Sequence, residues 1–421
     1  MSGLAVVVSR SLFTALLLSA LGASATGIAK AVINLDLPPE ERWHDFALEH
    51  RDAIINKALT MGETFEDGLG PAMTARWMNA APVDDTLLAE YKGIVKTVNH
   101  SAVTLQRMVL TDMWHAVHSP SFECTGLLAA TENGTVIHGR NIDYEMNNFA
   151  DHFMKKPKHL SGTGMVGVFD GTFLKGGKPI VQFLATIGSL GIHTGMRYGA
   201  WSFNSNARIV ENDMRKNLNA TEHGSKNFPW VARKYLEEIS DFDSALAAFD
   251  STNFNAPNYF ILAGAGPYEG AIVTVDRGGV RLPGTPPMQR LNRTAGVWHL
   301  VQTNDDLLEP PLDARRGAAL LRLSKATPSN VNEGFVLGEM TASPVMNSDT
   351  LLTWVANPAA GTHTVIVKDP MEVAAGMFNK FWHRQMHLPM PQDLPIEPPK
   401  QDLSRPKAAL RASLLQLHAA A

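Results

Sequence analysis

The sequence changes character once, near Ser119, and this change limits the folds that the chain can adopt. Before it, apolar residues recur at helical spacing over 83–98 and 103–115, and the stretch from about 35 to 120 is predicted to be mostly helical. After it, the chain is rich in glycine, and helical patterns return at 228–239, 242–249 and about 312–323. The short β-prone runs are 125–131, 136–140, 165–169, 180–187, 200–204, 259–263, 271–276, 297–303, 350–355 and 362–367. Strands in two clusters with helices grouped between them predict α+β layers rather than βαβ alternation.

The chain contains a single cysteine, Cys124, among its 421 residues. One cysteine cannot close an intrachain disulfide, although secreted proteins usually carry cysteines in pairs. A lone cysteine is either an inert, buried, small apolar side chain or a reactive nucleophile. The count does not separate these two interpretations, so the residues around Cys124 must do so.

The first 25 residues have the pattern of a secretory signal peptide. Arg10 precedes an apolar run at 12–21, and small residues follow at 23–25. A buried N-terminal helix is the alternative interpretation, since the run is shorter than the roughly 20 residues of a membrane-spanning helix. The sequence also contains four Asn-X-Ser/Thr sequons, at Asn99, Asn133, Asn219 and Asn292. We therefore expect a secreted or lysosomal protein that is glycosylated at these asparagines.

Charge argues against one class of partner, and the C-terminal tail suggests another. The 37 basic and 41 acidic residues give a formal net charge of −4 without a long run of either sign, which argues against nucleic-acid binding. Residues 388–406 are rich in proline and predicted to be extended, and 407–421 can form a short amphipathic helix. That helix is expected to dock on the protein, with transient contact to a membrane surface as the alternative.

The residues that follow Cys124 predict a β-hairpin. The dipeptide Asn-Gly at 133–134 favours a two-residue type I′ turn, with 136–140 as the return strand. With that loop, Cys124 lies directly opposite Asp143, on the same face and about 5 Å away. Arg140 then falls on the other face, unless a bulge just before it turns it inward. From these residues alone, the favoured interpretation is that Asn141 and Asp143 end a strand and that Arg140 pairs on the surface.

Two mechanisms would make Cys124 a nucleophile. A Cys–His pair is the commoner one, but His138 is predicted to lie some five residues along the strand, so a remote histidine such as His193 or His299 would be needed. The alternative needs no histidine. If the peptide bond before Cys124 is cut, the freed α-amino group has a pKa near 7.7–8.0 and can accept the thiol proton. A nearby Asp143 would orient the ammonium, and a nearby Arg140 would favour the thiolate.

The segment around Cys124 resembles a known family. Cys-Thr at 124–125, followed by His-Gly-Arg-Asn-Ile-Asp-Tyr at 138–144, is similar to the N-terminal-nucleophile segment of the acid ceramidase and N-acylethanolamine-hydrolysing acid amidase family, relatives of the bile-salt hydrolases. The family's arginine and aspartate lie 16 and 19 positions after the cysteine, and both intervals hold here. Further stretches resemble the family in order, at 33–43, 188–195, 256–264, 301–304 and 312–316, so the resemblance covers about 33 to 370.

The resemblance implies a self-cleaving precursor and a set of site residues. The chain would cut itself between Glu123 and Cys124, and Cys124 would then serve as the nucleophile. The other implied site residues are Arg140, Asp143, Asn304 and Arg315. The first two would position and tune the thiol and amine, the third would stabilise the oxyanion, and the fourth would brace the site. No metal and no cofactor are expected.

The resemblance also implies the domain organisation. A signal peptide at 1–25 would be followed by a helical small subunit at 26–123, a catalytic subunit at 124–387 and the tail at 388–421. The implied fold is a four-layer αββα N-terminal-nucleophile hydrolase core with this N-terminal helical subunit. With a single cysteine, the two subunits would have to stay together non-covalently.

The implied activity is hydrolysis of the amide bond of N-acyl lipids. Ceramide is placed ahead of N-acylethanolamine because of the matches at 35–43 and 302–304. A lipid-binding carrier that kept the fold and an ordinary Cys–His hydrolase are the competing hypotheses. The sequence departs from the family at three places: Glu123 stands where an apolar residue is expected, Asp305 replaces a tyrosine, and Ala314 replaces an aspartate.

Overall fold

The structure is a computed structural model that describes residues 28–118, 122–144, 167–209, 212–306 and 313–367. The predicted signal peptide and the C-terminal tail, 388–421, lie outside these residues. The chain divides into two compact units, each assembled from separated segments. Unit 1 comprises Met1–Val117, Lys155–Gly195 and Met214–Glu238, and unit 2 comprises His118–Met154, Met196–Asp213 and Ile239–Ala421.

Unit 1 combines the predicted helices with a small sheet. Strand β1 (Ala29–Asn34) pairs in parallel with β4 (Val168–Lys175), which pairs antiparallel with β5 (Lys178–Thr186). The helices are α2 (His44–Glu49), α3 (Arg51–Met61), the π-helix η2 (Gly62–Leu69), α4 (Pro71–Ala80), α5 (Asp85–Val98), α6 (Leu105–His118), α8 (Met214–Glu222) and α9 (Phe228–Glu238). Helix α5 begins at its N-cap Asp84, whose carboxylate accepts from the Leu87 amide, and ends at Asn99 in the left-handed conformation.

A buried ion cluster joins the segments of unit 1. The Glu90 carboxylate, on α5, accepts two hydrogen bonds of 2.7 Å from the Arg233 guanidinium of α9 and one of 2.9 Å from Arg42. Three residues further along α5, a Cβ on Gly93 would lie 2.1 Å from the Glu40 carbonyl oxygen, so the helix can approach that turn only with glycine there.

Within unit 2, antiparallel strands lie in two sheets. In the first, the unit 2 strands have the order β7 (Trp201–Ala207), β8 (Asn258–Gly264), β9 (Gly270–Val275) and β10 (Gln289–Arg290). The second has the order β11 (His299–Gln302), β2 (Phe122–Ala130), β3 (Val136–Tyr144), β12 (Thr350–Asn357) and β13 (Thr362–Val367). The chain passes from unit 1 into unit 2 within the short strand β6 (Thr194–Arg197).

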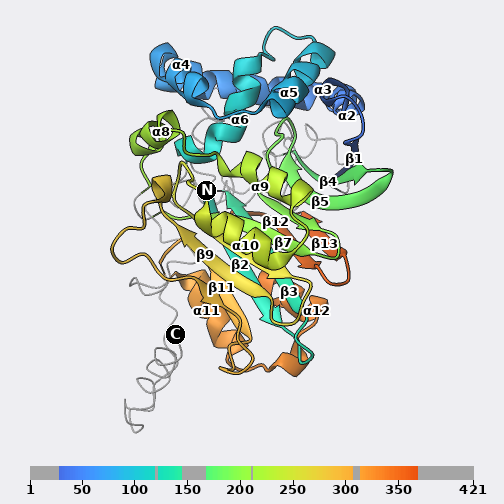
Figure 1. The fold of residues 1–421 in the computed structure, drawn as a ribbon, viewed down its shortest axis with the longest axis vertical. Helices are drawn as coiled ribbons and strands as arrows, with labels where there is room; N and C mark the ends of the chain where they lie inside the picture. The colour runs from blue at the N-terminus through green and yellow to red at the C-terminus, as the bar shows by residue number, and fades with distance from the viewer. Residues whose placement is uncertain (1–27, 119–121, 145–166, 210–211, 307–312, 368–421) are drawn as a thin grey trace, which may run out of the picture. The chain divides into compact units, whose positions relative to one another are not determined.

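The sheets of unit 2 face each other between two helical layers (Figure 1). Strands β2 and β3 contact β7 and β8 across the interface between the sheets. Helix α10 (Phe242–Ser251) covers β8 and β9, whereas α11 (Ala314–Leu323) and α12 (Glu333–Thr341) cover the outer face of the other sheet. The order helix, sheet, sheet, helix confirms the predicted four-layer αββα core.

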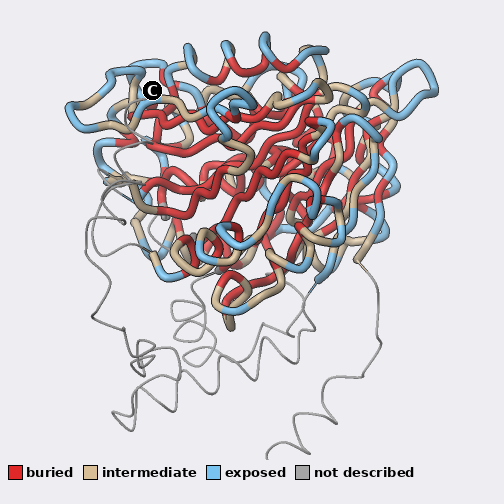
Figure 2. Tube along the Cα trace, turned by 90° about the horizontal axis from the view of Figure 1, so that it is seen from below, coloured by how far each residue is buried: buried red, intermediate tan, exposed pale blue. Residues whose placement is uncertain are grey.

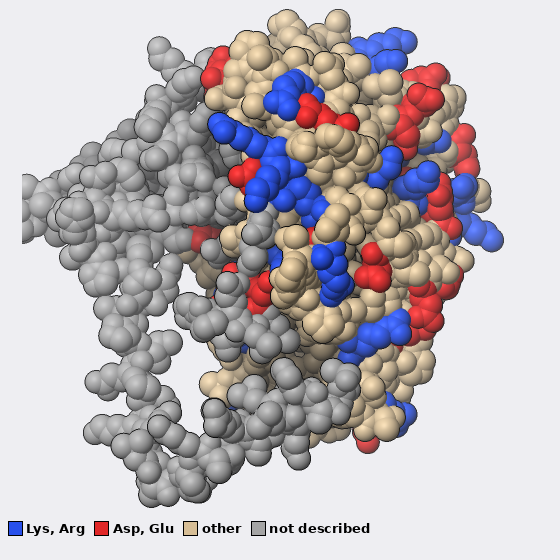
Figure 3. Space-filling model, turned by 60° about the vertical axis from the view of Figure 1, so that its left-hand side comes forward, with Lys and Arg blue, Asp and Glu red and all other residues tan. Residues whose placement is uncertain are grey.

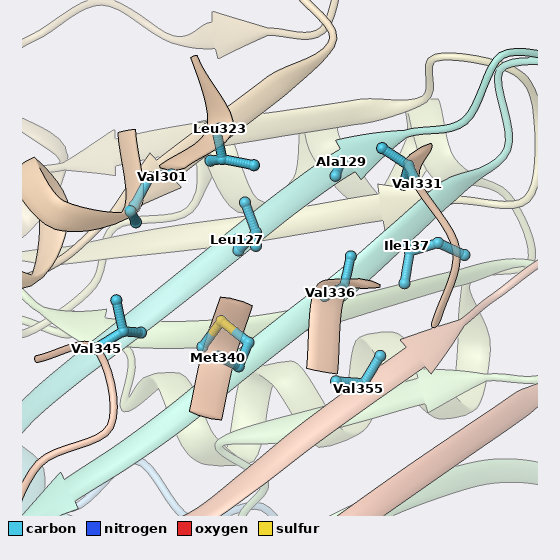
Figure 4. Packing of buried hydrophobic residues seen from close by; sticks show 11 residues of the cluster. Leu127, Ala129, Ile137, Val301, Leu323, Val331, Val336, Met340, Val345 and Val355 are labelled. Atoms are coloured by element: carbon cyan, nitrogen blue, oxygen red, sulfur yellow. The ribbon is translucent and has the colours of Figure 1, made fainter. Parts of the chain in front are cut away.

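Alternation along β2 divides its side chains between two cores. Leu128 and Ala130 face the other sheet, where they pack with Tyr259 and Ile261 of β8. Leu127 and Ala129 face the opposite way and pack under α11 and α12, as Figure 4 shows. Buried residues accordingly run along the central strands (Figure 2). The hairpin that begins at the cysteine is therefore held from both sides.

Most predicted elements are present in the structure. The helical patterns at 83–98, 103–115, 228–239 and 242–249 correspond to α5, α6, α9 and α10, and each β-prone run overlaps a strand. The elements not predicted from the sequence are β1, β6, β10, α8 and α12. No helix in the described ranges is long and apolar enough to cross a bilayer.

Candidate active site

The hairpin that starts at Cys124 has a different register from the predicted one. Thr131 N donates to Thr135 O and Gly134 N donates to Thr131 O, so the loop has three residues, 132–134, with only Gly134 at positive φ (98°). Cys124 therefore lies opposite Ile142, and Glu123 lies opposite Asp143. The prediction of a two-residue turn that places Cys124 opposite Asp143 is wrong by one residue. A one-residue shift moves every side chain to the other face.

The observed register brings Arg140 to the thiol without a bulge. Arg140 is two residues from Ile142, the partner of Cys124, so strand alternation puts both side chains on the face toward the other sheet. Its Nη2 donates to Cys124 Sγ at 3.4 Å, and its Nη1 donates to the Ser205 carbonyl at 2.8 Å. The predicted need for a bulge near Gly139 is thus removed. Packing explains the glycine at position 139 instead, since a Cβ there would lie 2.7 Å from Met340 of α12.

Asp143 reaches the site from the opposite face of the hairpin. Its carboxylate accepts from Arg315 Nη1 at 2.9 Å, from Thr350 Oγ1 at 2.6 Å and from Asn347 Nδ2 at 3.4 Å. Strand β12 has a register shift at Thr350, beside Asp143. Burial raises the pKa of Asp143, and the charge of Arg315 opposes this rise. The Asp143 carboxyl group is thus held by one guanidinium, Arg315, and by two polar donors.

Arg315 links four parts of the site from the first turn of α11. Its guanidinium donates to Asp143, to both carboxylate oxygens of Asp313 (2.6 and 3.1 Å), to Asn304 Oδ1 (3.1 Å) and to the Cys124 carbonyl (3.4 Å). Asp313 also caps the helix, because it accepts from the Arg315 amide at 2.8 Å. One planar cation therefore holds the strand of Cys124, Asp143 and Asn304 together.

Asn304 holds the nitrogen of Cys124. It lies two residues beyond the end of β11, and its Oδ1 accepts from Cys124 N at 2.7 Å. Its Nδ2 donates to the Ala207 carbonyl at 2.8 Å. The sulfur and the nitrogen of Cys124 thus have different partners, Arg140 for the first and Asn304 for the second.

The Cys124 thiol lies in a dry environment, with 2% of the residue exposed. Burial raises its pKa, whereas the positive charges of Arg140 and Arg315 and a hydrogen bond from the Asp143 backbone oppose the rise. In the uncut chain the sulfur is therefore a thiol rather than a thiolate. A base is needed before it can act efficiently as a nucleophile.

The two histidines on neighbouring strands are too far from the sulfur to be that base. His138 pairs with Leu128 and His299 with Ala129, four and five residues along β2 from Cys124. At about 3.3 Å per residue these positions lie more than 10 Å away. The Cys–His hypothesis therefore finds no support in either residue.

His138 is a structural residue whose burial makes the folded protein less stable at low pH. It is fully buried, with Nδ1 and Nε2 hydrogen-bonded to Ser202 Oγ (2.9 Å) and Asn204 Oδ1 (2.7 Å). Burial lowers its pKa to about 3, against the effect of the Asn204 hydrogen bond. The folded protein thus resists a proton that the unfolded chain accepts below about pH 6.5.

We expect His138→Gln to reduce the loss of stability on acidification. The imidazole imposes no penalty above about pH 6.5, and the penalty grows by about 1.4 kcal/mol per pH unit as the pH falls toward 3, reaching about 2–3 kcal/mol at about pH 4.5. Urea unfolding of both proteins at about pH 7 and pH 4.5 measures the difference. An identical decrease in the two proteins would contradict this prediction.

The structure brings all five predicted site residues together and adds others that the sequence analysis missed. Cys124, Arg140, Asp143, Asn304 and Arg315 form one connected cluster within unit 2. The residues missed are Ser205, Asn206, Asp313, Asn347 and Thr350. The polar side chains of Ser-Phe-Asn-Ser-Asn at 202–206, inside a strand with apolar flanks, were a usable signal, because buried polar residues need partners.

The four asparagines predicted to be glycosylated lie outside this cluster. Asn99, Asn133, Asn219 and Asn292 are all exposed, which is a requirement for modification.

On the face shown in Figure 3, basic and acidic side chains both occur across the described residues. This mixture fits the small net charge of the sequence.

Architecture and site together define a class. The αββα core of unit 2 carries a cysteine near the start of a central strand, with its nitrogen and sulfur separately held, and this arrangement fits an N-terminal-nucleophile hydrolase. The chain is a homologue of acid ceramidase and of N-acylethanolamine-hydrolyzing acid amidase. It is 26% identical over 360 residues to the acid ceramidase of Homo sapiens, covering 80% of this chain and 85% of that protein. It is 26% identical over 334 residues to the N-acylethanolamine-hydrolyzing acid amidase of Rattus norvegicus, covering 78% of this chain and 85% of that protein.

Two further comparisons complete these findings. A solved N-acylethanolamine-hydrolyzing acid amidase ortholog of Caenorhabditis elegans shares 24% sequence identity, with a TM-score of 0.48, and the match covers 58% of this chain and 100% of that one. No protein-family model matches the chain.

Proposed function

We propose that the protein is a self-cleaving amidohydrolase that hydrolyses the amide bond of N-acyl lipids, with ceramide as the preferred substrate. One observation carries the proposal: Cys124 Sγ lies at Arg140 Nη2 (3.4 Å) while Cys124 N lies at Asn304 Oδ1 (2.7 Å). Both atoms that the mechanism requires belong to one residue and have separate polar partners. The names of the homologous enzymes supply the substrate class.

Self-cleavage follows from this arrangement. The Cys124 sulfur attacks the carbonyl carbon of Glu123, the bond from that carbon to the Cys124 nitrogen breaks, and the nitrogen takes the thiol proton. Water then hydrolyses the thioester, which leaves a carboxylate on Glu123 and a free thiol on Cys124. Asn304 and Arg315 hold the nitrogen and the carbonyl of Cys124 during this rearrangement.

Hydrolysis of the lipid amide uses the groups that cleavage creates. The α-amine of Cys124 takes the thiol proton, and the sulfur attacks the acyl carbon of the substrate. The amine then gives the proton to the departing nitrogen, and water releases the fatty acid from the thioester. Arg140 favours the anionic sulfur through its charge. Asn304 is predicted to stabilise the oxyanion, a contact typically worth about 3–4 kcal/mol in the transition state.

The two cleavage products stay together by packing. Within unit 1, the pairing of β1 with β4 joins a strand before residue 123 to one after it. The Glu90–Arg233 ion pair does the same between α5 and α9, and the Asp112 carboxylate accepts from the Leu190 and Gly191 amides at 2.9 Å. These buried connections support non-covalent association of residues 26–123 with 124–387.

The compartment is proposed to be lysosomal or extracellular. The proposal rests on the predicted signal peptide at 1–25 and on the exposed positions of the four sequon asparagines. Transient contact with a lipid surface would give the enzyme access to its substrate. The predicted helix at 407–421 is proposed to dock on the protein, with contact to that surface as the alternative.

The test is a direct assay of both substrate classes. Purified protein, incubated at about pH 5, should release sphingosine and fatty acid from ceramide faster than ethanolamine from an N-acylethanolamine. Faster hydrolysis of the N-acylethanolamine would reverse the order of the two substrates. Binding of either lipid without any release of amine would identify a lipid carrier and contradict the proposal.

A further inference from the structure

The segment that carries Asn304 is irregular, yet its position is tightly fixed. Strand β11 ends at Gln302, so no ladder hydrogen bonds hold the residues after it. Polar side chains replace them. Asn206 Nδ2 donates to the Gln302 and Thr303 carbonyls (2.9 and 3.3 Å), and Arg316 Nη1 donates to the Asp306 carbonyl (3.2 Å).

Two connections join this segment to the end of β7. Asn304 itself is held by main-chain atoms on either side of Arg208: its Nδ2 donates to the Ala207 carbonyl at 2.8 Å, and its carbonyl accepts from the Ile209 amide at 3.3 Å. The Arg208 side chain makes the second connection. Its Nε and Nη2 donate to the two carboxylate oxygens of Asp306, at 2.8 and 2.7 Å.

The Arg208–Asp306 pair is anchored on both sides. Arg208 is 3% exposed and also pairs through Nη1 with Asp276, which is 1% exposed. Tyr259 OH donates to Asp306 Oδ1 at 2.5 Å. Burial alone would raise the pKa of Asp306, but hydrogen bonds from Arg208 and Tyr259 outweigh that effect and hold its pKa below the ordinary value. The carboxylate therefore stays ionised, and a bidentate pair fixes direction as well as distance.

We propose that Arg208 and Asp306 are positioning residues for the reaction at Cys124. Their ion pair fixes the segment 304–306 against 207–209, and this fixes Asn304 Oδ1 on the Cys124 nitrogen. The inference rests on the proposed function only for its hydrolysis readout, since self-cleavage tests it separately. Neither side chain contacts the sulfur in the structure, so both act through Asn304. A displacement of about 1 Å in such a group can lower a rate by about 100-fold.

Asp306→Asn tests the proposal, with Asp276→Asn as the matched control. Each variant removes one carboxylate charge from the same guanidinium. Asp276 lies on the far side of Arg208 from Asn304 and also accepts from residues 282 and 285, so Asp276→Asn leaves both hydrogen bonds between Arg208 and Asp306 in place. We expect Asp306→Asn to lower kcat by about 10- to 100-fold with KM changed less than about threefold. Asp276→Asn should lower kcat by less than about threefold at equal folded fraction. Self-cleavage should slow in the same order.

A purely structural role predicts a different result. Equal losses in Asp306→Asn and Asp276→Asn, once folded fractions are matched, would overturn the proposal. If Asp306→Asn does not fold, Tyr259→Phe tests the positioning role in its place. This variant removes only the hydroxyl that donates to Asp306. It should lower kcat by about threefold with an unchanged Tm, and an unchanged kcat would overturn the proposal. A wild-type protein that cleaves itself but hydrolyses neither lipid would refute the proposed function, and the self-cleavage rates would still test the positioning role.

Discussion

Cys124→Ala should remain a single chain and lose amide hydrolysis by a factor of about 10⁴ or more. The change removes the atom that attacks the Glu123 carbonyl, so the precursor cannot rearrange. It also removes the nucleophile of the second reaction. A denaturing gel after incubation at about pH 5, with a lipid hydrolysis assay on the same sample, measures both effects.

Stability should hardly change in this variant, which separates the chemical loss from misfolding. Cys124 forms no disulfide, and its replacement removes one sulfur atom from a packed site. We expect a loss of roughly 1 kcal/mol in the free energy of unfolding, the usual effect of a single substitution. Normal cleavage of the Cys124→Ala chain would show that another group cuts the precursor.

Arg315→Met should be the most damaging change among the other site residues. It leaves the Asp143 carboxyl group buried without its cation, and Asn304 Oδ1 loses the hydrogen bond from Arg315 Nη2. Removal of one partner of a buried pair typically costs about 3–5 kcal/mol. We expect a loss of that size in the free energy of unfolding, measured in urea, and a decrease in kcat of about 100-fold or more.

A second substitution identifies the cause of that loss. Asp143→Asn in the Arg315→Met background removes the buried charge that lacks a partner. The double variant should therefore recover about 2 kcal/mol of the lost stability. Its activity should stay low, because Asp143 and Arg315 both act at the site. If the double variant is less stable than Arg315→Met by the full effect of Asp143→Asn alone, the two residues are not energetically coupled.

The fold was largely predictable because its signals are local. Helix α5 has an aspartate cap, apolar residues at helical spacing and a left-handed C-terminal residue. The strands of unit 2 are short apolar runs between turn residues. Strand β1 was missed because its pairing with β4 comes from residues far away in the sequence. Burial alternates along this six-residue strand, but its exposed Val32 interrupts the apolar–polar alternation in the sequence.

The site residues were predicted from the family resemblance, and their geometry was not. The Asn-Gly pair suggested a two-residue turn, but the loop has three residues, and this single residue decides which faces carry Arg140 and Asp143. Only the tertiary surroundings fix the register of the hairpin. Odd-numbered residues such as Leu127 must meet α11 and α12, and even-numbered ones such as Leu128 must meet the other sheet.

The corrected register explains how one hairpin serves two functional groups. The face toward the other sheet carries the sulfur and Arg140, in a dry environment. The face toward α11 carries Asp143 and the guanidinium of Arg315, which reaches around to the Cys124 carbonyl. The nitrogen of Cys124 points to Asn304 at the edge of the same sheet. The thiol and the backbone nitrogen of Cys124 are therefore held from different sides of the strand.

The most direct test is the mass of the larger polypeptide in active, purified protein. The mechanism requires a chain that begins with Cys124 and carries a free α-amino group, because that amine is the proton acceptor for the thiol. Intact-mass and N-terminal peptide measurements should find this species, and its amount should rise in proportion to the hydrolytic rate. Full activity in a chain that is still continuous across Glu123 and Cys124 would contradict the mechanism.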